Sequence, residues 1–323
     1  MIRYVGKRLL QMIPILLAVA ILVFTLMYFV PGDPVQIMLG DSATPEQIAA
    51  ARTQFGLDKP YLIRLWNYLT GILHLDFGTS YTQGSSVAEE LALRFPRTLT
   101  LSTLSILVTI IVGIPIGIQC AIHANKMSDK VWMFLTMLGN SMPAFWLALM
   151  LVLLFSVKLG WLPSNGTGGL EYYILPVAAN SIGSLASIAR QTRSSMLEVI
   201  RSDYVVTARA KGLSERKVIW NHALPNALIP IITICGSRFG FLLGGTVILE
   251  TVFSIPGIGM YMVNGINSRD YPVVQGSIIY VAFIFAFIML ITDLIYAYVD
   301  PRIKAQYMRS VKASDKKKDN KAA

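Results

Sequence analysis

The sequence predicts an all-α membrane protein whose helices cross the bilayer six times. Of its 323 residues, 54% are hydrophobic and only 14% are charged, whereas a typical soluble domain carries about 25% charged residues. The mean hydropathy is +0.57. A single soluble core could not cover this much apolar surface, so the composition excludes an ordinary soluble enzyme. The hydrophobic content is also far above the level that is typical of disordered chains.

The six crossings are predicted from six long apolar stretches. The first, residues 9–30, contains no charged residue and would form a helix about 33 Å long, which is enough to span a bilayer. Pro-Gly-Asp-Pro follows it in place of a small-residue cleavage site, so we expect this crossing to be retained and not removed as a signal peptide. The other five are expected at residues 99–122, 131–157, 172–189, 228–249 and 277–299.

The basic residues predict the orientation of these crossings. Six crossings place both termini on one face, and that face carries twenty lysines and arginines against seven on the other. Basic loops stay in the cytoplasm, so both termini and the loop at residues 190–227 are expected to be cytoplasmic. The net charge of +10 then reflects orientation and contact with anionic membrane lipid, not binding of nucleic acid. The Lys-rich end is expected to be solvated.

The segment between the first two crossings is too long to be a bare connection. Thr44, Pro45 and Gln47 are typical of a helix start, and a second short helix is expected over residues 61–73. This segment should fold as a small cap, either as a packing lid or as a docking surface for an external protein. The expected division is 1–30 (N-terminal end and first helix), 31–98 (external loop domain), 99–300 (five-helix core with the loop 190–227) and 301–323 (basic tail).

The fourth crossing carries a polar stripe. Asn180, Ser184 and Ser187 share one helical face, and polar side chains in lipid turn toward neighbouring helices or toward water. Two interpretations therefore stay open for this stripe: helix-to-helix hydrogen bonding and lining of a translocation pathway. Gly113 and Gly117 in the second crossing predict close packing against another helix.

Few charges fall inside the crossings. Arg238 and Asp293 are expected to pair between helices. The three histidines lie outside the crossings and lack the spacing of an HxxxH motif, so no metal site is predicted. A proton- or sodium-driven secondary transporter would need carboxylates near the middle of the membrane, and a membrane enzyme would need a nucleophile with a base or a metal. The sequence favours neither.

The loop at residues 190–227 predicts two short cytoplasmic helices. The first should end at Gly212, the residue expected at a left-handed C-terminal cap, and Ser214 should cap the second. We expect Leu224-Pro225 to end this second helix before the chain re-enters the membrane. Such a unit could brace the bundle or be inserted into another protein.

Here the sequence resembles the EAA loop of bacterial ABC importer permeases. The resemblance is carried by Thr207-Ala208-Arg209-Ala210-Lys211-Gly212, followed by Ile219 and Leu224-Pro225. Thr207 stands where the family name implies Glu, and this form is usual in the branch for peptides and nickel. The matching segments elsewhere are Pro31-Gly32-Asp33-Pro34, Asp76-Phe77-Gly78, Glu250-Thr251-Val252-Phe253, Pro256-Gly257, Arg269-Asp270-Tyr271-Pro272 and Asp300-Pro301-Arg302. Together they cover roughly residues 1–305.

The resemblance implies a type I importer subunit in a bacterial inner membrane. Its partners would be a second homologous permease in a heterodimer, two ABC ATPase subunits and an extracytoplasmic substrate-binding protein. The residues that would couple it to the ATPase are Tyr204, Thr207, Ala208, Arg209, Ala210, Lys211, Gly212, Leu224 and Pro225.

The energy for transport would come from ATP that is bound by partner chains. No G-x-x-x-x-G-K-[ST] phosphate loop occurs in the sequence, so this subunit is not expected to be an enzyme or to hold a cofactor, and ATP with Mg²⁺ would bind the partner ATPases. The expected function is alternating-access import of short peptides, either dipeptides or oligopeptides. Import of glutathione or of nickel and other metal chelates by the same machinery is the alternative.

Overall fold

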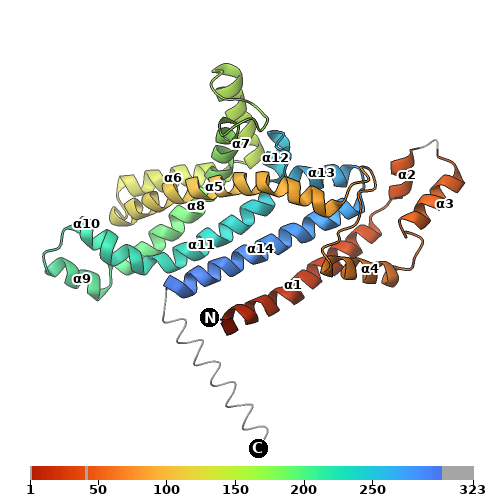
Figure 1. Ribbon diagram of the computed structural model, residues 1–323. Coiled ribbons are helices and arrows are strands. Elements are labelled where there is room, and N and C mark those ends of the chain that lie inside the picture. Colours follow the sequence, from red (N-terminus) through yellow and green to blue (C-terminus); the bar gives the residue numbers. More distant parts are fainter. Residues whose placement is uncertain (1, 41–42, 300–323) are drawn as a thin grey trace, which may run out of the picture. The chain divides into compact units, whose positions relative to one another are not determined.

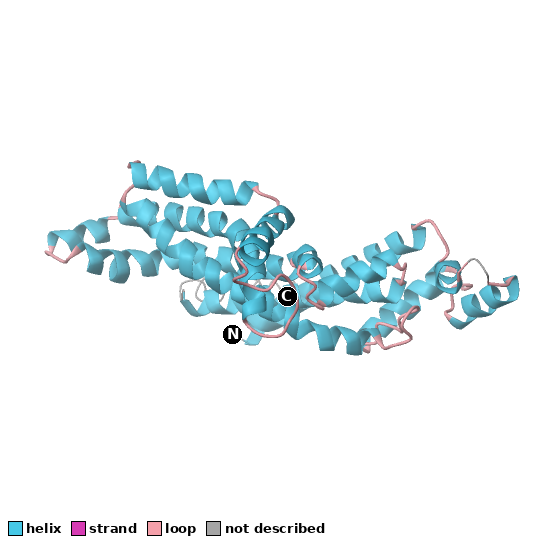
Figure 2. Ribbon diagram, turned by 90° about the horizontal axis from the view of Figure 1, so that it is seen from above, coloured by secondary structure: helices cyan, strands magenta, loops and turns pink. Residues whose placement is uncertain are grey.

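The computed structural model describes residues 2–40 and 43–299. Within these ranges every regular element is a helix (Figure 2), apart from an isolated antiparallel bridge between Thr79 and Ser86. The prediction of an all-α fold is confirmed. The basic tail, predicted to be solvated, lies outside the described residues.

The helices follow one another along the chain, with the longest connections at residues 74–86 and 159–170 (Figure 1). They are α1 (Ile2–Phe29), α2 (Pro34–Leu39), α3 (Pro45–Gln54), α4 (Tyr61–Leu73), α5 (Val87–Ile122), α6 (Met127–Ser141), α7 (Ala144–Leu151), the π-helical η1 (Val152–Lys158), α8 (Glu171–Ile200), α9 (Asp203–Ala210), α10 (Glu215–Lys217), the π-helical η2 (Val218–Ala223), α11 (Leu224–Gly245), α12 (Val247–Val252), α13 (Ile258–Asn267) and α14 (Tyr271–Val299).

Five of these helical runs are long and apolar enough to cross a membrane, and a broken pair makes a sixth if it counts as one span. The broken pair is α6 with α7 and η1, where we expected one crossing over residues 131–157 with a kink at Pro143. The chain leaves the helix at Met142 and Pro143, because proline has no N–H to donate and its ring clashes with the preceding turn. The second and fourth crossings are longer than expected, since α5 begins at Val87 and α8 ends at Ile200.

The chain forms two compact units. Unit 1 comprises Met1–Val108, Ser141–Gly183 and Phe239–Phe287, and unit 2 comprises Thr109–Asn140, Ser184–Arg238 and Ile288–Ala323. Unit 1 has one apolar cluster around Leu101 and Phe253 and another around Val87 and Tyr261. The core of unit 2 gathers around Met196.

The segment after α1 in unit 1 contains the two helices predicted from its sequence. Thr44 accepts a hydrogen bond from the backbone N–H of Gln47 while the Gln47 side chain accepts one from the Thr44 backbone, which is a complete capping box. The expected second helix is α4, with the bounds Tyr61–Leu73.

A fully buried carboxylate, Glu250 of α12, links three segments of unit 1. Its side chain is 0% exposed and accepts hydrogen bonds from Thr98 Oγ1 (2.7 Å), Thr246 Oγ1 (3.0 Å) and the backbone N–H of Met260 (3.1 Å). Glu250 lies beyond the candidate span that ends at Gly244. Burial raises the pKa of this carboxyl, and the hydrogen bonds, that from Thr98 first, oppose the rise.

A second buried carboxylate, Asp270, secures the start of α14. One of its oxygens accepts hydrogen bonds from Ser80 Oγ (2.6 Å), the Thr82 backbone N–H (3.1 Å) and Thr82 Oγ1 (2.9 Å). The side chain is 1% exposed. Asp270 therefore ties the loop before α5 to the entry of α14.

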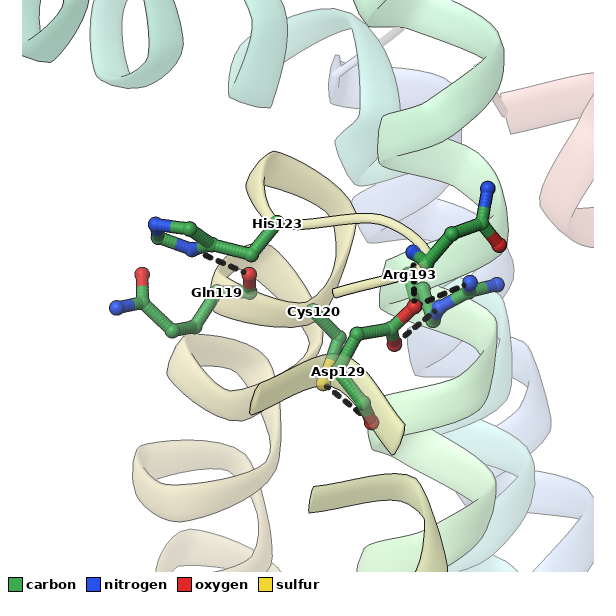
Figure 3. A network of polar contacts seen from close by, with 6 residues as sticks. Gln119, Cys120, His123, Asp129 and Arg193 are labelled. Atoms are coloured by element: carbon green, nitrogen blue, oxygen red, sulfur yellow. Dashed lines mark hydrogen bonds and ion pairs between the residues drawn. The ribbon is translucent and has the colours of Figure 1, made fainter. Parts of the chain in front are cut away.

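A third buried carboxylate, Asp129 of α6, pairs with Arg193 of α8 in unit 2 (Figure 3). Arg193 donates from Nε to Oδ1 (2.8 Å) and from Nη2 to Oδ2 (2.7 Å), and the backbone N–H of Asn125 donates to Oδ2 (2.9 Å). Asp129 is 3% exposed. This two-pronged geometry is the strong form of an arginine–carboxylate contact.

Helices α5 and α8 approach closely in unit 2, as the glycines predicted. A Cβ on Gly117 would lie 2.6 Å from the Ala189 carbonyl oxygen and 2.5 Å from the Thr192 Cβ. Both distances are too short for real atoms, so only glycine allows α8 to pack here.

The Asp129–Arg193 pair gives a stability prediction. Arg193→Met leaves the buried carboxylate without its cation, and we expect it to lower the free energy of unfolding by about 3–5 kcal/mol. Thermal unfolding of the detergent-purified protein measures this loss. The matched control is the double variant Asp129→Leu with Arg193→Met, which should recover most of the stability because apolar side chains replace both charges. A double variant as unstable as Arg193→Met alone would contradict this role of the pair.

Candidate functional site

The candidate site is the loop of unit 2 between α8 and α11. After α8 ends at Ile200, the chain forms α9, turns at Gly212, and continues through α10 and η2 into α11. In Figure 1, α9 and α10 lie next to each other at the end of α8 and α11. The prediction of a short helix that ends before Gly212 and is followed by a second helix is confirmed.

The turn between α9 and α10 depends on Gly212. Its φ is +77°, a left-handed conformation that side chains disfavour. Its backbone N–H donates to the Arg209 carbonyl (2.9 Å). Ser214 is at the N-cap position as expected, but its side chain makes no capping hydrogen bond. Instead, Arg209 Nε donates to Glu215 (2.7 Å), and this ion pair closes the turn.

The expectation that Leu224-Pro225 ends the second helix is wrong. The helical run from Glu215 continues to Gly244. The turn just before this dipeptide, η2, is π-helical, and a π-helical turn is wider than an α-helical one. This widening gives room for the ring of Pro225, which would clash with the preceding turn of a regular α-helix.

Helix α9 has one buried and one exposed face. Val205 is 0% exposed and Ala208 is 5% exposed, and both pack into the core of unit 2 with Met196. On the other face Tyr204 is 46% exposed and Val206 is 54% exposed. These apolar side chains lie outside every candidate membrane span. The arrangement is suited to docking against another protein.

The other residues predicted for coupling are divided between the helices. Thr207, Ala210 and Lys211 are exposed beside Tyr204 and Val206. Leu224 and Pro225 do not lie on α9 at all but at the start of α11, where Leu224 packs against the core of unit 2.

Two residues of the polar stripe, Asn180 and Ser187, bind other helices. In unit 1, Asn180 Nδ2 donates to Ser105 Oγ of α5 (3.1 Å). In unit 2, Arg238 of α11 donates to Ser187 Oγ, so Arg238 has the interhelical partner that was expected. Ser184 is buried. These contacts suit helix-to-helix bonding, and lining of a pathway stays a prediction.

Three buried carboxylates that organise the fold were missed as functional groups. Asp129 and its partner Arg193 are 64 positions apart, and nothing in the local pattern of either helix indicates the pairing. Glu250 and Asp270 appeared only inside segments of resemblance. Among the residues that the structure describes, no group of three His, Cys, Asp or Glu could hold a metal ion.

Comparisons with known proteins cover almost the whole chain. Residues 113–305 match the family described as binding-protein-dependent transport system inner membrane component, and residues 1–102 match the N-terminal region of the same kind of membrane component. The glutathione transport system permease protein GsiC of Salmonella choleraesuis is 44% identical over 304 residues, with 94% of this chain and 99% of the relative covered.

Two further comparisons agree with this match. A putative peptide transport system permease protein of Brucella abortus (strain 2308) is 42% identical over 306 residues, with 92% of this chain and 98% of the relative covered. Among solved structures, the MetNI methionine ABC transporter in an inward-facing conformation matches with a TM-score of 0.57 and 19% identity, covering 65% of this chain and 96% of that chain. At this identity the structural match supports the fold alone. On the sequence matches, the chain belongs to the family of binding-protein-dependent transport system inner membrane components, the permease subunits of ABC importers.

Proposed function

We propose that this permease imports short peptides handed over by an extracytoplasmic binding protein, and that α9 is the element through which an ATPase subunit drives it. The observation that carries the coupling role is the exposed face of α9. Tyr204 and Val206 expose apolar surface outside the candidate spans, while Val205 and Ala208 fix the opposite face in the core.

The contacts of α9 suit a transmission role. Its buried face belongs to the same apolar cluster as Met196 of α8, Val218 and Ile219 of η2, and Ile231 of α11. A displacement applied to the exposed face would therefore move α8 and α11 as well, because a close-packed core transmits strain instead of absorbing it.

The proposed assembly follows from this role. Two ATPase subunits would bind ATP and Mg²⁺ on the cytoplasmic side, a second homologous permease would complete a heterodimer, and both termini of this chain would be cytoplasmic. ATP-driven closure of the ATPases would favour the outward-facing conformation of the permease pair, and ATP hydrolysis would allow its return to the inward-facing one. Asn180, Ser184 and Ser187 are proposed to line the pathway in at least one of these conformations.

The substrate class is proposed from the relatives. Their names state glutathione and peptide transport, and glutathione is itself a tripeptide, so both names fall within short peptides. Nickel or other metal chelates are the remaining alternative.

The first prediction concerns contact between α9 and an ATPase. A photoreactive probe on Val206→Cys should capture an ATP-hydrolysing subunit in membranes, because this side chain is 54% exposed. The same probe on Val205→Cys should capture none, since Val205 is its 0%-exposed neighbour. Mass spectrometry of the crosslinked band identifies the subunit. Capture from neither position, with both variants inserted in the membrane, would count against the coupling role.

The second prediction concerns the turn at Gly212. A side chain in this conformation costs about 1–2 kcal/mol, and a Cβ here meets no atom within 4 Å, so strain and not crowding should be the defect. Gly212→Glu should reduce the peptide transported per ATP hydrolysed in reconstituted vesicles. Gly212→Asn should retain most of it, because asparagine tolerates this conformation. Normal coupling in Gly212→Glu would contradict the role of the turn.

The third prediction concerns the cargo. Vesicles that contain the purified importer and its binding protein should accumulate labelled dipeptides or tripeptides in an ATP-dependent and saturable way, as measured by filtration. A matched set without ATP gives the background. ATP-dependent uptake of a nickel chelate with no uptake of any peptide would exclude the peptide assignment and leave the coupling role intact.

A further inference from the structure

A pocket of about 350 Å³ lies in unit 1, mostly within the segment between α1 and α5. Its lining residues come from the ranges 53–59, 64–71 and 76–81 of that segment, from Phe24 of α1 and from the first turns of α14. Pockets of about 300–1,000 Å³ are the usual size of small-molecule sites. Neither the coupling role of α9 nor the polar stripe of α8 gives this pocket a function.

Two cations of the pocket have no anionic partner. The guanidinium of Arg64 lies over the ring of Tyr28, with its Cζ 5.4 Å from the ring centroid, and within the described residues neither Arg64 nor Lys59 makes an ion pair. Among the described lining residues the one acid is Asp76, which accepts a hydrogen bond from the backbone N–H of Gly78 (2.9 Å). Bases therefore outnumber acids two to one in this lining.

The charge of Arg64 acts on the lining of the pocket. Burial raises the pKa of Tyr81 to about 12, and the positive charge of Arg64 opposes this rise, so the guanidinium lies near the hydroxyl of this lining residue. Asp270 also lies near Tyr81, but Ser80 and Thr82 already donate hydrogen bonds to one of its oxygens. Arg64 is thus available to an anionic group of a ligand.

A tyrosine of the lining lacks a partner as well. The hydroxyl of Tyr68 is buried, and the described part of the chain offers it no hydrogen-bond partner. Burial raises its pKa, so the group stays protonated and able to donate. A buried hydroxyl without a partner costs about 1–3 kcal/mol, and an acceptor on a ligand would recover part of this cost.

The rest of the lining is largely aromatic. Phe24, Phe55, Phe77 and Tyr81 contribute ring surface, and the ring centroids of Phe55 and Tyr81 are 4.5 Å apart. Aromatic walls with a few convergent polar groups are typical of sites for small organic molecules. The pocket therefore suits a ligand that carries an anionic group next to an apolar one.

We propose that this pocket binds the C-terminal end of a short peptide, with the carboxylate on Arg64 and the last side chain against the aromatic wall. A guanidinium offers parallel N–H groups that match the two oxygens of a carboxylate. Lys59, which is exposed, adds a second positive charge. Asp76 suits the ammonium group that a peptide carries and that a simple carboxylate anion lacks.

This inference rests on the proposed peptide cargo and adds a binding site for it on the permease itself. The segment between α1 and α5 is expected to be external, so its pocket would meet the peptide before the crossings do. The pocket belongs to unit 1 and α9 to unit 2, so the peptide site and the coupling role can fail independently.

The test measures peptide binding to the full chain, purified in detergent with the subunits that accompany it but without the binding protein. Equilibrium dialysis with labelled alanyl-phenylalanine gives the affinity, and the same dipeptide with a C-terminal amide serves as the ligand without a carboxylate. We expect the amide to bind about tenfold more weakly than the free acid, because one charge-assisted contact is lost.

Variants of the chain locate this contact. Arg64→Gln should weaken binding of the free acid about tenfold and leave binding of the amide unchanged. The matched control is Arg97→Gln, which removes the same charge from unit 1 outside the pocket and should leave binding of both ligands unchanged. Tyr68→Phe should weaken binding of the free acid without lowering the thermal stability, because the hydroxyl that it removes has no partner among the described residues.

Four results would overturn the proposal. Equal affinity for the free acid and the amide would exclude a contact with the carboxylate. Equal losses in Arg64→Gln and Arg97→Gln would show general attraction by basic residues without a site. Unchanged peptide binding in Arg64→Gln, together with weaker attachment of the binding protein, would assign the pocket to a carboxylate of that protein. Displacement of the dipeptide by acetate at the same concentration would identify a site for any small carboxylate.

Failure of this inference can be told apart from failure of the proposed cargo. An importer that binds no dipeptide by itself, but accumulates peptides in vesicles when its binding protein is added, would refute the peptide site and leave the cargo assignment intact. An importer that neither binds nor accumulates any peptide would refute both.

Discussion

A charge that leaves water must find its partners inside the protein, and this requirement determines the contacts that hold each unit together. Glu250, Asp270 and Asp129 are 0%, 1% and 3% exposed, and each is surrounded by donors from a segment distant in sequence. Glu250 binds Thr98 across 152 positions, and Asp270 binds Ser80 across 190. Lipid and apolar cores supply no hydrogen-bond donors that could replace these. The contacts therefore specify which segments pair, whereas apolar packing tolerates many pairings.

The need for buried partners also explains why two segments have the residues they do. From the sequence alone, these segments were linked to the importer family only by resemblance. In the segment from Glu250 to Gly257, the carboxylate needs space as well as donors, since a Cβ on Gly257 would lie 2.5 Å from the Glu250 carboxyl group. In the segment from Arg269 to Pro272, Asp270 is the residue that connects α14 to the loop before α5. Each of these two segments therefore contains a buried carboxylate.

Much of the fold could be predicted because its signals are local. Apolar runs identified the crossings, the Thr44 to Gln47 pattern identified the start of α3, and Gly212 identified the turn after α9. The π-helical passage through Pro225 was missed, and at Pro143 the helix breaks with a bend of 98° where only a kink was expected. A proline inside an apolar run can either kink a helix or end it. The exposed face of α9 could be seen only once Val205 and Ala208 were packed in the core, because the two faces of this short helix differ little in polarity. The Asp129–Arg193 pair carries no local signal, because its members belong to different helices.

The Asp129–Arg193 ion pair also affects the order in which the helices can assemble in the membrane. The chain enters the membrane from its N-terminus, so α6 is in place before α8 has been synthesised. Until Arg193 arrives, Asp129 must stay in contact with water or with the lipid headgroups. A slip of α8 by one helical turn would separate Arg193 from Asp129 and leave both charges without their partner. The pair therefore forms only when α6 and α8 are correctly aligned, so it selects that alignment late in the assembly of the protein.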